Sequence, residues 1–374
     1  MEAITVGASV VGLLGLSGLG LWWLTASRRP RGRAAAPTPA VRPARPPAVP
    51  PQAPAASLTA PAEPAPAELA AFTPRRLDEL PKERQAAYRQ VFKDVPRPPR
   101  LLHHLLSPAF FDGASSAQLV ELISAEPLIA ARVLATVNSA AYGLSRPVTA
   151  IGQAVTHLGL NQVRSLCVQH IMRTCFMVDR AERQPQLEAT WAASALASEL
   201  TQRLGLALGV DDRGGLVSAV VLSFLGRLAT QAHTPMGILE TIPPRNLLAR
   251  TTAEERQLGL CAAEIGRLLM TAWELPPSVV ADAADLDRVL VQPPHGDAHG
   301  QRLALGYLCA RLGERMAHGE LPDLAAFDLA ADRDAECFHL RALLGTPPLT
   351  DLPARLRAPD LLQAMQRLRT ALKV

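Results

Sequence analysis

The 374-residue sequence has few cysteines, and no two of them form a CxxC motif. A small disulfide-stapled domain or a structural zinc site would need more of them, at closer and more regular spacing. We therefore expect the cysteines to be buried apolar thiols in a reducing compartment. They are Cys167, Cys175, Cys261, Cys309 and Cys337.

Histidine is absent from long parts of the chain. None lies between His170 and His233, or between His233 and His295. The sequence also lacks a glycine-rich phosphate loop of the P-loop type and a Gly-x-Ser-x-Gly motif. The two missing motifs disfavour a P-loop nucleotidase and a serine hydrolase of the nucleophile-elbow type.

Most of the chain lacks an excess of positive charge. The formal net charge is +4, but six arginines and one acid in residues 1–62 already supply about +5. The remaining 32 basic and 33 acidic side chains nearly cancel. A nucleic-acid-binding domain usually carries a basic surface of its own, so this distribution disfavours nucleic acid as a partner.

Residues 3–26 contain no charged side chain, and this run ends shortly after Trp22 and Trp23. Its length suits a transmembrane helix with interfacial tryptophans. A cleaved signal peptide would need positive charge before the apolar run, where only Glu2 stands. Four arginines follow the run instead, which predicts an N-terminus outside and the rest of the chain in the cytoplasm. They are Arg28, Arg29, Arg31 and Arg33.

Residues 27–70 are rich in proline, alanine and arginine. Such a composition cannot bury a core, and its prolines favour extended polyproline-like conformations. We expect a disordered, semi-rigid linker.

The stretch from Ser124 to Met172 gives the clearest helical pattern. Pro127 suits a first helical turn, and Asn138 with Ser139 is expected to end that helix. Gly159 is expected to close a later helix and Asn161 to cap the one after it. Apolar residues fall on one face of that later helix at Ile151, Ala154, Val155 and Leu158.

The rest of the chain is also predicted to be helical, with no strand periodicity. Ser115 or Ser116 is expected to cap a helix. The acidic pairs Asp211–Asp212 and Glu254–Glu255 are each expected to precede a helix, where acids favour the helix dipole. The further predicted helices are residues 82–92, 101–106, 301–317 and 359–372.

Several segments together resemble the HDOD domain, an all-helical output domain related to the HD phosphohydrolases. The resemblance covers about residues 95–285 and implies a multi-helix HD-like bundle at 75–290. It also implies helices at 191–204 and 216–229, the second being the helix that bears the His-Asp pair in HD enzymes. Residues 291–374 are expected to be a helical extension that completes or flanks the bundle. The segments are Glu126-Pro127-Leu128, Val137-Asn138-Ser139-Ala140-Ala141-Tyr142 and Trp273-Glu274-Leu275-Pro276.

The resemblance also shows which chemistry has been lost. HD enzymes hold metal ions with histidines and aspartates, and the metal activates a water. Ser223 and Phe224 stand where the family's His-Asp pair would lie. Serine is a poor metal ligand and phenylalanine is none. We therefore expect no catalytic activity, no metal and no cofactor.

Asn138, Ser139 and Tyr142 form the most notable polar group. One interpretation is that they line a groove for a ligand or partner. The other is that Asn138 and Ser139 end a helix while Tyr142 packs its ring and bonds a neighbouring backbone group.

The resemblance implies a role in bacterial signal transduction through contacts with kinases, cyclases or regulators. With the predicted anchor, the chain is expected to be a single-pass inner-membrane protein with a cytoplasmic domain. The first alternative is a nucleotide or cyclic-dinucleotide sensor that uses the former HD cavity, which requires Arg132, Arg164 or Arg227 to face it. The second is a residual metal-dependent phosphodiesterase.

Overall fold

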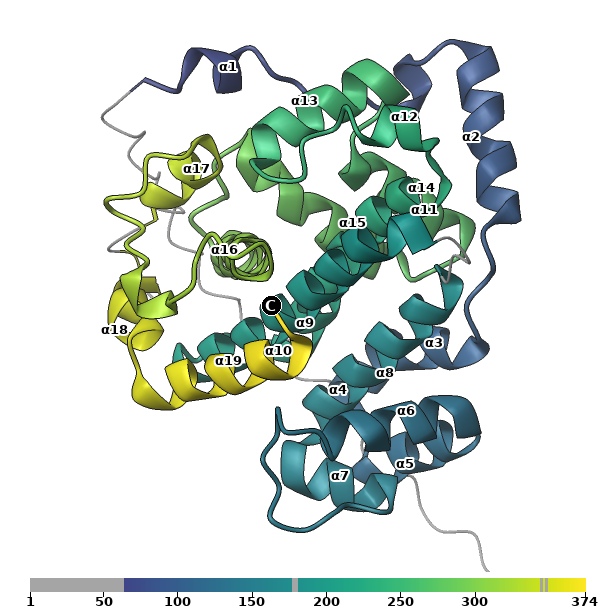
Figure 1. The fold of residues 1–374 in the computed structure, drawn as a ribbon, viewed down its shortest axis with the longest axis vertical. Helices are drawn as coiled ribbons and strands as arrows, with labels where there is room; N and C mark the ends of the chain where they lie inside the picture. The colour runs from purple at the N-terminus through teal and green to yellow at the C-terminus, as the bar shows by residue number, and fades with distance from the viewer. Residues whose placement is uncertain (1–63, 177–180, 344–345, 347–348) are drawn as a thin grey trace, which may run out of the picture. The chain divides into compact units, whose positions relative to one another are not determined.

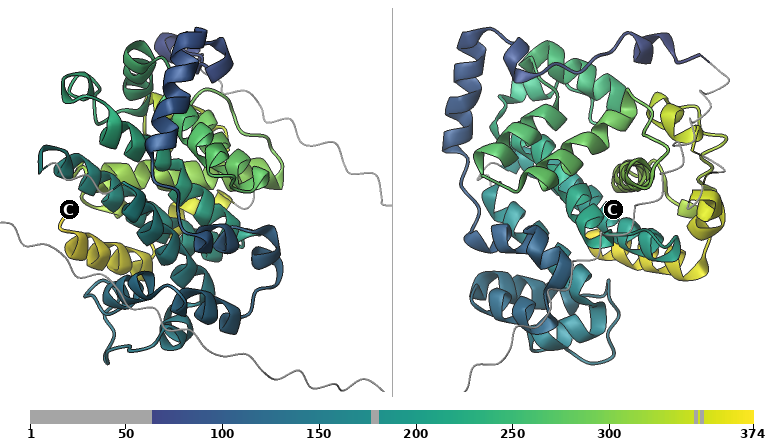
Figure 2. Two further views of the ribbon diagram at one scale, coloured as in Figure 1. Left: turned by 90° about the vertical axis from the view of Figure 1, so that its right-hand side faces the viewer. Right: turned by 180° about the vertical axis from the view of Figure 1, so that it is seen from behind.

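The computed structural model describes residues 64–374, apart from 177–180, 344–345 and 347–348. The predicted span 3–26 and most of the predicted linker 27–70 lie outside these residues. Within the described ranges every regular element is a helix, which confirms the all-α prediction. Figure 1 shows the arrangement, and Figure 2 shows it from the side and from behind.

The described chain begins with short helices. The first lies inside the range predicted as linker, so the linker prediction extends too far at this end. Leu69 explains the difference, because its side chain is buried against the folded domain. The third helix confirms the prediction at 82–92. The elements are α1 (Ala67–Ala70), η1 (Leu77–Glu79) and α2 (Lys82–Asp94).

Six helices follow, and α5, α6 and α7 pack together against α8. Ser115 caps α5, because its hydroxyl accepts from Gln118 N at 3.2 Å. The expectation for Asn161 is wrong: Gly159, at φ 83°, serves as the C-cap of α7 and the N-cap of α8, so Asn161 lies within the first turn of α8. The bounds are α3 (Arg100–Leu105), α4 (Pro108–Gly113), α5 (Ser116–Ser124), α6 (Pro127–Val137), α7 (Ile151–Leu158) and α8 (Leu160–Cys175).

The centre of the core is the long helix α9, whose residues are mostly buried. The predicted single helix 216–229 is two helices that break at Phe224, where Phe224 N bonds Val221 O in a tighter turn. The stretch Arg213–His233 is long and apolar enough to cross a membrane, but here it is buried in the protein core. The bounds are α9 (Gln184–Ala207), α10 (Arg213–Ser223) and α11 (Leu225–His233).

Of the next helices, α14 packs on α11 and α15 packs on α10. The backbones of α11 and α14 approach closely, since a Cβ on Gly226 would lie 1.7 Å from Ala262 O. Glu254 and Glu255 lie inside α13 and not before a helix, which corrects that expectation. The dipole argument still holds for Glu254, which accepts from Ala262 N at the start of α14. The bounds are α12 (Met236–Leu239), α13 (Leu247–Leu258), α14 (Ala262–Ala272), α15 (Pro277–Leu286) and η3 (Asp287–Leu290).

The C-terminal helices share the core of the preceding ones. Helix α16 packs along α9, and Figure 1 shows it end-on beside that helix. Helix α19 also packs against α9. Residues 291–374 therefore contribute to the bundle itself. The bounds are α16 (Ala298–Ala317), η4 (Leu324–Ala326), η5 (Ala335–Cys337), α17 (Phe338–Arg341), η6 (Leu349–Asp351), α18 (Leu352–Leu356) and α19 (Pro359–Leu372).

Candidate functional site

Ser223 and Phe224 lie at the junction of α10 and α11, and neither is placed to hold a ligand. The Ser223 hydroxyl donates to Val220 O at 2.8 Å. Phe224 is only 2% exposed and belongs to the hydrophobic core. The position that the resemblance assigns to the metal pair is therefore occupied by a helix-bonded hydroxyl and a packed ring.

A group of buried charged side chains surrounds this junction, and we call it the Glu314 cluster. Glu314 Oε1 lies 2.5 Å from Arg227 Nη1 and 3.0 Å from Arg250 Nη2, while Oε2 lies 2.8 Å from Arg311 Nη1. One carboxylate thus binds three guanidinium groups. The cluster comprises Arg227, Arg250, Glu254, Asp287, Arg311 and Glu314.

The outer carboxylates complete the charge balance of the cluster. Asp287 Oδ1 lies 3.3 Å from Arg311 Nη2, and Glu254 accepts from Ala262 N at 2.7 Å. Glu254 also lies 4.0 Å from the Nε of Arg250. Three arginines therefore face three acids, which is the arrangement that makes buried charge tolerable.

The pKa values follow from burial and this pairing. Burial by itself would raise the pKa of Glu314, but Arg250, Arg311 and Arg227 together bring it well below its usual range. Burial lowers the pKa of Arg227 to about 10, with Arg250 adding to the effect, so the guanidinium stays charged at neutral pH. Burial raises the pKa of both Glu254 and Asp287.

The residues of this position do not fit a metal ion. The cavity that Ser223 and Phe224 line has a volume of about 10 Å³, at the lower limit for a single water. The neighbouring carboxylates are already bound, Glu314 and Asp287 by guanidinium groups and Glu254 by Ala262 N. Among residues 64–374 that the structure describes, no group of three or more His, Cys, Asp or Glu is placed to hold a metal.

The segment that follows α1 is attached close to the cluster. Arg75 N donates to Glu255 Oε1 at 2.6 Å, and Leu77 N donates to Glu264 Oε1 at 3.2 Å. A groove of about 750 Å³ lies between this segment and helices α14 and α15. The chain that leads out of the predicted linker is thus bound to the face of the domain beside the Glu314 cluster.

Of the three polar residues of the predicted groove, the structure brings only Tyr142 to a cavity. The amide of Asn138 bonds both Val148 N, at 2.7 Å, and Val148 O, at 2.8 Å, and so clamps the turn between them. Ser139 N bonds Thr136 O as α6 ends. The Tyr142 hydroxyl accepts from Gln162 Nε2 at 3.1 Å and not from a backbone group.

The three arginines that the sensor hypothesis requires do not converge. Only Arg227 lines the Ser223–Phe224 position, and Glu314 binds it there. Arg164 is buried in α8. Burial lowers its pKa to about 10, although the nearby charge of Asp212 acts to raise it. Arg132 lies on α6 beside His170.

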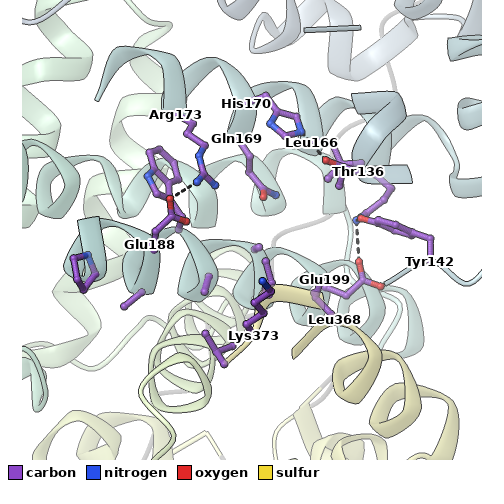
Figure 3. A pocket seen from close by; sticks show the side chains of 18 residues that line it. Thr136, Tyr142, Leu166, Gln169, His170, Arg173, Glu188, Glu199, Leu368 and Lys373 are labelled. Atoms are coloured by element: carbon purple, nitrogen blue, oxygen red, sulfur yellow. Dashed lines mark hydrogen bonds and ion pairs between the residues drawn. The ribbon is translucent and has the colours of Figure 1, made fainter. Parts of the chain in front are cut away.

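A second cavity, of about 340 Å³, lies between α8 and α9, with α6 and α19 contributing to its wall. We call it the α8–α9 cavity. Figure 3 shows Arg173 and Glu188 on one side of it and Tyr142 and Glu199 on the other. Lys373 reaches it from the C-terminal residues.

His170 in this cavity is neutral at physiological pH. Burial, reinforced by Arg132 and Arg173, lowers its pKa to about 4. One ring nitrogen, Nε2, lies 3.0 Å from the Thr136 hydroxyl. The ring is therefore a neutral hydrogen-bonding group in the wall.

Sequence reasoning missed most of this cavity. Gln162, Gln169 and Arg173 follow one another at helical spacing along α8, between apolar positions such as Val163 and Leu166. That polar stripe on a largely buried helix was the available signal. Its partners on α9 are too distant in sequence for a pattern to link them.

The described elements form an all-helical bundle, with Ser223 and Phe224 at the junction of α10 and α11. The family model described as the HDOD domain matches residues 95–288. The chain belongs to the HDOD domain family.

Solved structures share this fold. The chain is similar to an HDOD domain protein of unknown function from Geobacter sulfurreducens, with a TM-score of 0.52 and 17% identity over 77% of this chain and 98% of that one. It is similar to a candidate phosphohydrolase from Shewanella amazonensis, with a TM-score of 0.50 and 19% identity over 76% and 98%. A candidate signal transduction protein from Marinobacter aquaeolei matches with a TM-score of 0.50 and 17% identity over 78% and 65%. No curated protein matches the chain.

Proposed function

We propose that this protein is a non-catalytic regulatory protein that acts by binding signalling proteins. The observation that carries the proposal is the Glu314 cluster. It surrounds the position that the resemblance assigns to a metal pair with mutually neutralising charges, and the cavity that Ser223 and Phe224 line is about 10 Å³. A domain that retains the fold without this chemistry is suited to recognition.

The proposed place of action is the inner membrane. The predicted span 3–26 would anchor the chain, and the predicted linker 27–70 would hold the domain in the cytoplasm near the bilayer. Tethering raises the effective concentration of the domain toward membrane-bound partners. Kinases, cyclases and regulators are the partner classes that the family implies, and the Marinobacter relative carries a signal transduction name.

The two alternatives find less support at the Ser223–Phe224 position. A nucleotide sensor at this position would need a cavity of about 300 Å³ or more. A residual phosphodiesterase would need metal ligands where Ser223, Phe224 and three arginines stand. The sensor alternative predicts nucleotide binding at this position, and the phosphodiesterase alternative predicts bound metal and turnover. The regulatory proposal predicts neither.

The first test measures metal and turnover in the full chain, purified in detergent after growth with added manganese, iron and zinc. We expect substoichiometric metal by mass spectrometry and no hydrolysis of a phosphodiester such as bis(p-nitrophenyl) phosphate. An active HD phosphodiesterase serves as the positive control. Stoichiometric metal together with turnover that a chelator abolishes would overturn the proposal.

The second test is crosslinking in cells with the full chain and with a matched chain lacking residues 3–26. We expect the full chain to capture membrane-associated signalling proteins and the truncated chain to capture fewer of them. Recovery of nucleic-acid complexes alone, equally with both chains, would contradict the proposed mode of action.

A further inference from the structure

Helix α2 stands at the edge of the domain, and the views in Figures 1 and 2 agree on its place there. None of its described side chains is buried, and only Gln85, Tyr88 and Phe92 are half-buried. The Tyr88 hydroxyl donates to Leu258 O at 3.0 Å, and Gln85 Nε2 donates to Leu80 O at 2.8 Å. One side of α2 therefore holds it to the domain, and the rest of its surface faces solvent.

The basic side chains on the solvent side of α2 lie along one line. Arg89 follows Lys82 by seven residues and Lys93 follows it by eleven, which is close to two and three turns of an α-helix. All three are exposed, and among the described residues none of them has an ion-pair partner. We call Lys82, Arg89 and Lys93 the α2 stripe.

The acids of α2 fall on a different line. Glu83 and Asp94 are also eleven residues apart, and their positions lie about 100° around the helix from the α2 stripe. Two further arginines are engaged elsewhere. Arg84 donates to a backbone carbonyl at 3.5 Å, and Arg97, beyond the helix, pairs with Glu274 at 3.7 Å. The α2 stripe thus presents three positive charges on a line that carries no acid of its own helix.

The charge of the folded chain is divided unevenly around this helix. Residues 82–100 contain six basic and two acidic side chains. The other residues from 63 to 374 contain 26 basic and 31 acidic ones. In the field of a negatively charged bilayer, this polarity turns the α2 side of the domain toward the surface and the remainder away from it.

We propose that the α2 stripe docks the domain on the anionic phospholipid headgroups of the membrane to which the chain is tethered. Helix α2 begins twelve residues after the predicted linker ends at residue 70, so it is among the first elements that the tether reaches. The proposal rests on the proposed membrane anchoring and adds which face of the domain meets the bilayer. A nucleic acid would meet the same stripe, but the net negative charge of the rest of the domain opposes its wrapping around the protein.

The direct test is resonance energy transfer in the full chain reconstituted into vesicles. The donor fluorophore is attached to Ala86→Cys, an exposed position on α2, and the acceptor is a rhodamine-labelled lipid. The native cysteines are all buried, so the unmodified chain serves as the labelling control. We expect strong transfer in phosphatidylcholine vesicles that contain phosphatidylglycerol, weak transfer in pure phosphatidylcholine, and loss of the difference in molar salt.

A second labelling site tests the orientation of the domain. Ala354→Cys is exposed on α18, which Figure 1 shows at the edge of the domain opposite α2. We expect transfer from this site to be weak and to change little with phosphatidylglycerol. Equal transfer from both sites, or transfer from Ala86→Cys that is the same in both lipids, would overturn the proposal.

A triple variant with glutamine at all three positions of the α2 stripe tests the residues themselves. We expect the ratio of docked to undocked protein to fall about fivefold for each charge removed, and roughly a hundredfold in all. The matched control replaces Arg355, Arg357 and Arg367 by glutamine, which removes the same charge from exposed positions in the C-terminal helical region. It should stay within twofold of wild type, and circular dichroism confirms folding. Equal effects of the two triple variants would contradict the assignment of the α2 stripe.

Flotation of the same samples separates this proposal from the anchor on which it rests. A chain that floats with both kinds of vesicle, yet shows the same transfer in both, is anchored but not docked, which overturns the α2 proposal alone. A chain that molar salt releases from the vesicles is not anchored. Without the anchor, wild type must still float with phosphatidylglycerol vesicles and the triple variant must not, or docking is overturned too. Loss of RNA capture by the triple variant with unchanged transfer would assign the stripe to nucleic acid instead.

Discussion

The Glu314 cluster and the α8–α9 cavity use similar side chains with opposite results. In the cluster, three arginines pair with three acids, and the cavity beside Ser223 and Phe224 is only about 10 Å³. In the cavity, the half-exposed pair of Arg173 and Glu188 lines an open space of about 340 Å³. Charges that are buried against one another leave little space between them, whereas a half-exposed ion pair lines a cavity that stays open.

The largest expected effect breaks the closed side of this comparison. Glu314→Gln removes the negative charge that binds three guanidinium groups and leaves them facing one another. We expect a loss of about 3–5 kcal/mol in the free energy of unfolding, measured by urea denaturation. The matched change Glu188→Gln in the cavity breaks a half-exposed pair with Arg173, and we expect about 0–1 kcal/mol. Equal losses would show that the two regions do not differ as described.

The second prediction concerns pH and sharpens the cavity side. The pKa of His170 falls to about 4 in the folded protein, from about 6.5 in the unfolded chain. Below pH 6.5 the unfolded chain binds the proton more readily, so this contribution to stability is present above pH 6.5 and is lost as the pH falls toward 4. In His170→Gln, the loss of stability between pH 7 and pH 5 should be about 1–2 kcal/mol smaller than in wild type.

The control for this pH measurement is His157→Gln, which changes an exposed histidine on α7. It should keep the wild-type dependence on pH. A His170→Gln protein with an unchanged pH profile would show that the ring is not held neutral by its surroundings.

The smallest expected effect is that of Gln162→Met on stability. The substitution loses the two hydrogen bonds that Nε2 donates, but it also removes the oxygen without a donor. We expect the free energy of unfolding to change by about 1 kcal/mol or less in thermal or urea denaturation. A loss of about 3 kcal/mol or more would mean that Gln162 serves the fold as the Glu314 cluster does, and would remove the contrast between the two regions.

Local signals were sufficient for many helix boundaries. Ser115 begins α5, Pro127 begins α6, and α19 spans the predicted residues 359–372. These boundaries follow from capping and proline chemistry within a few residues. In a helix that is apolar on every face, no capping residue or change of periodicity marks a boundary. The break at Phe224 between α10 and α11 is therefore not predictable from the sequence.

The candidate sites were harder to predict than the helices. The sequence places Asn138 and Tyr142 in one polar group. In the structure, Asn138 clamps a turn while Tyr142 lines a cavity. Gln162 on α8 donates hydrogen bonds to both Tyr142 and Glu199. Its bond to Glu199 forms because α8 lies against α9. A one-dimensional pattern does not show which polar residue will find which partner.

The sequence by itself determined the helical class and the resemblance to the HDOD domain, which places Ser223 and Phe224 where a His-Asp pair is expected. Those properties depend on residue type and short-range spacing. Only the tertiary structure decided which side chains surround Ser223 and Phe224. Arg227 and Glu314 are 87 residues apart in sequence, and their ion pair exists because α11 and α16 enclose a space that excludes water. Burial gives such a pair its energetic weight, and burial is a property of the packed chain.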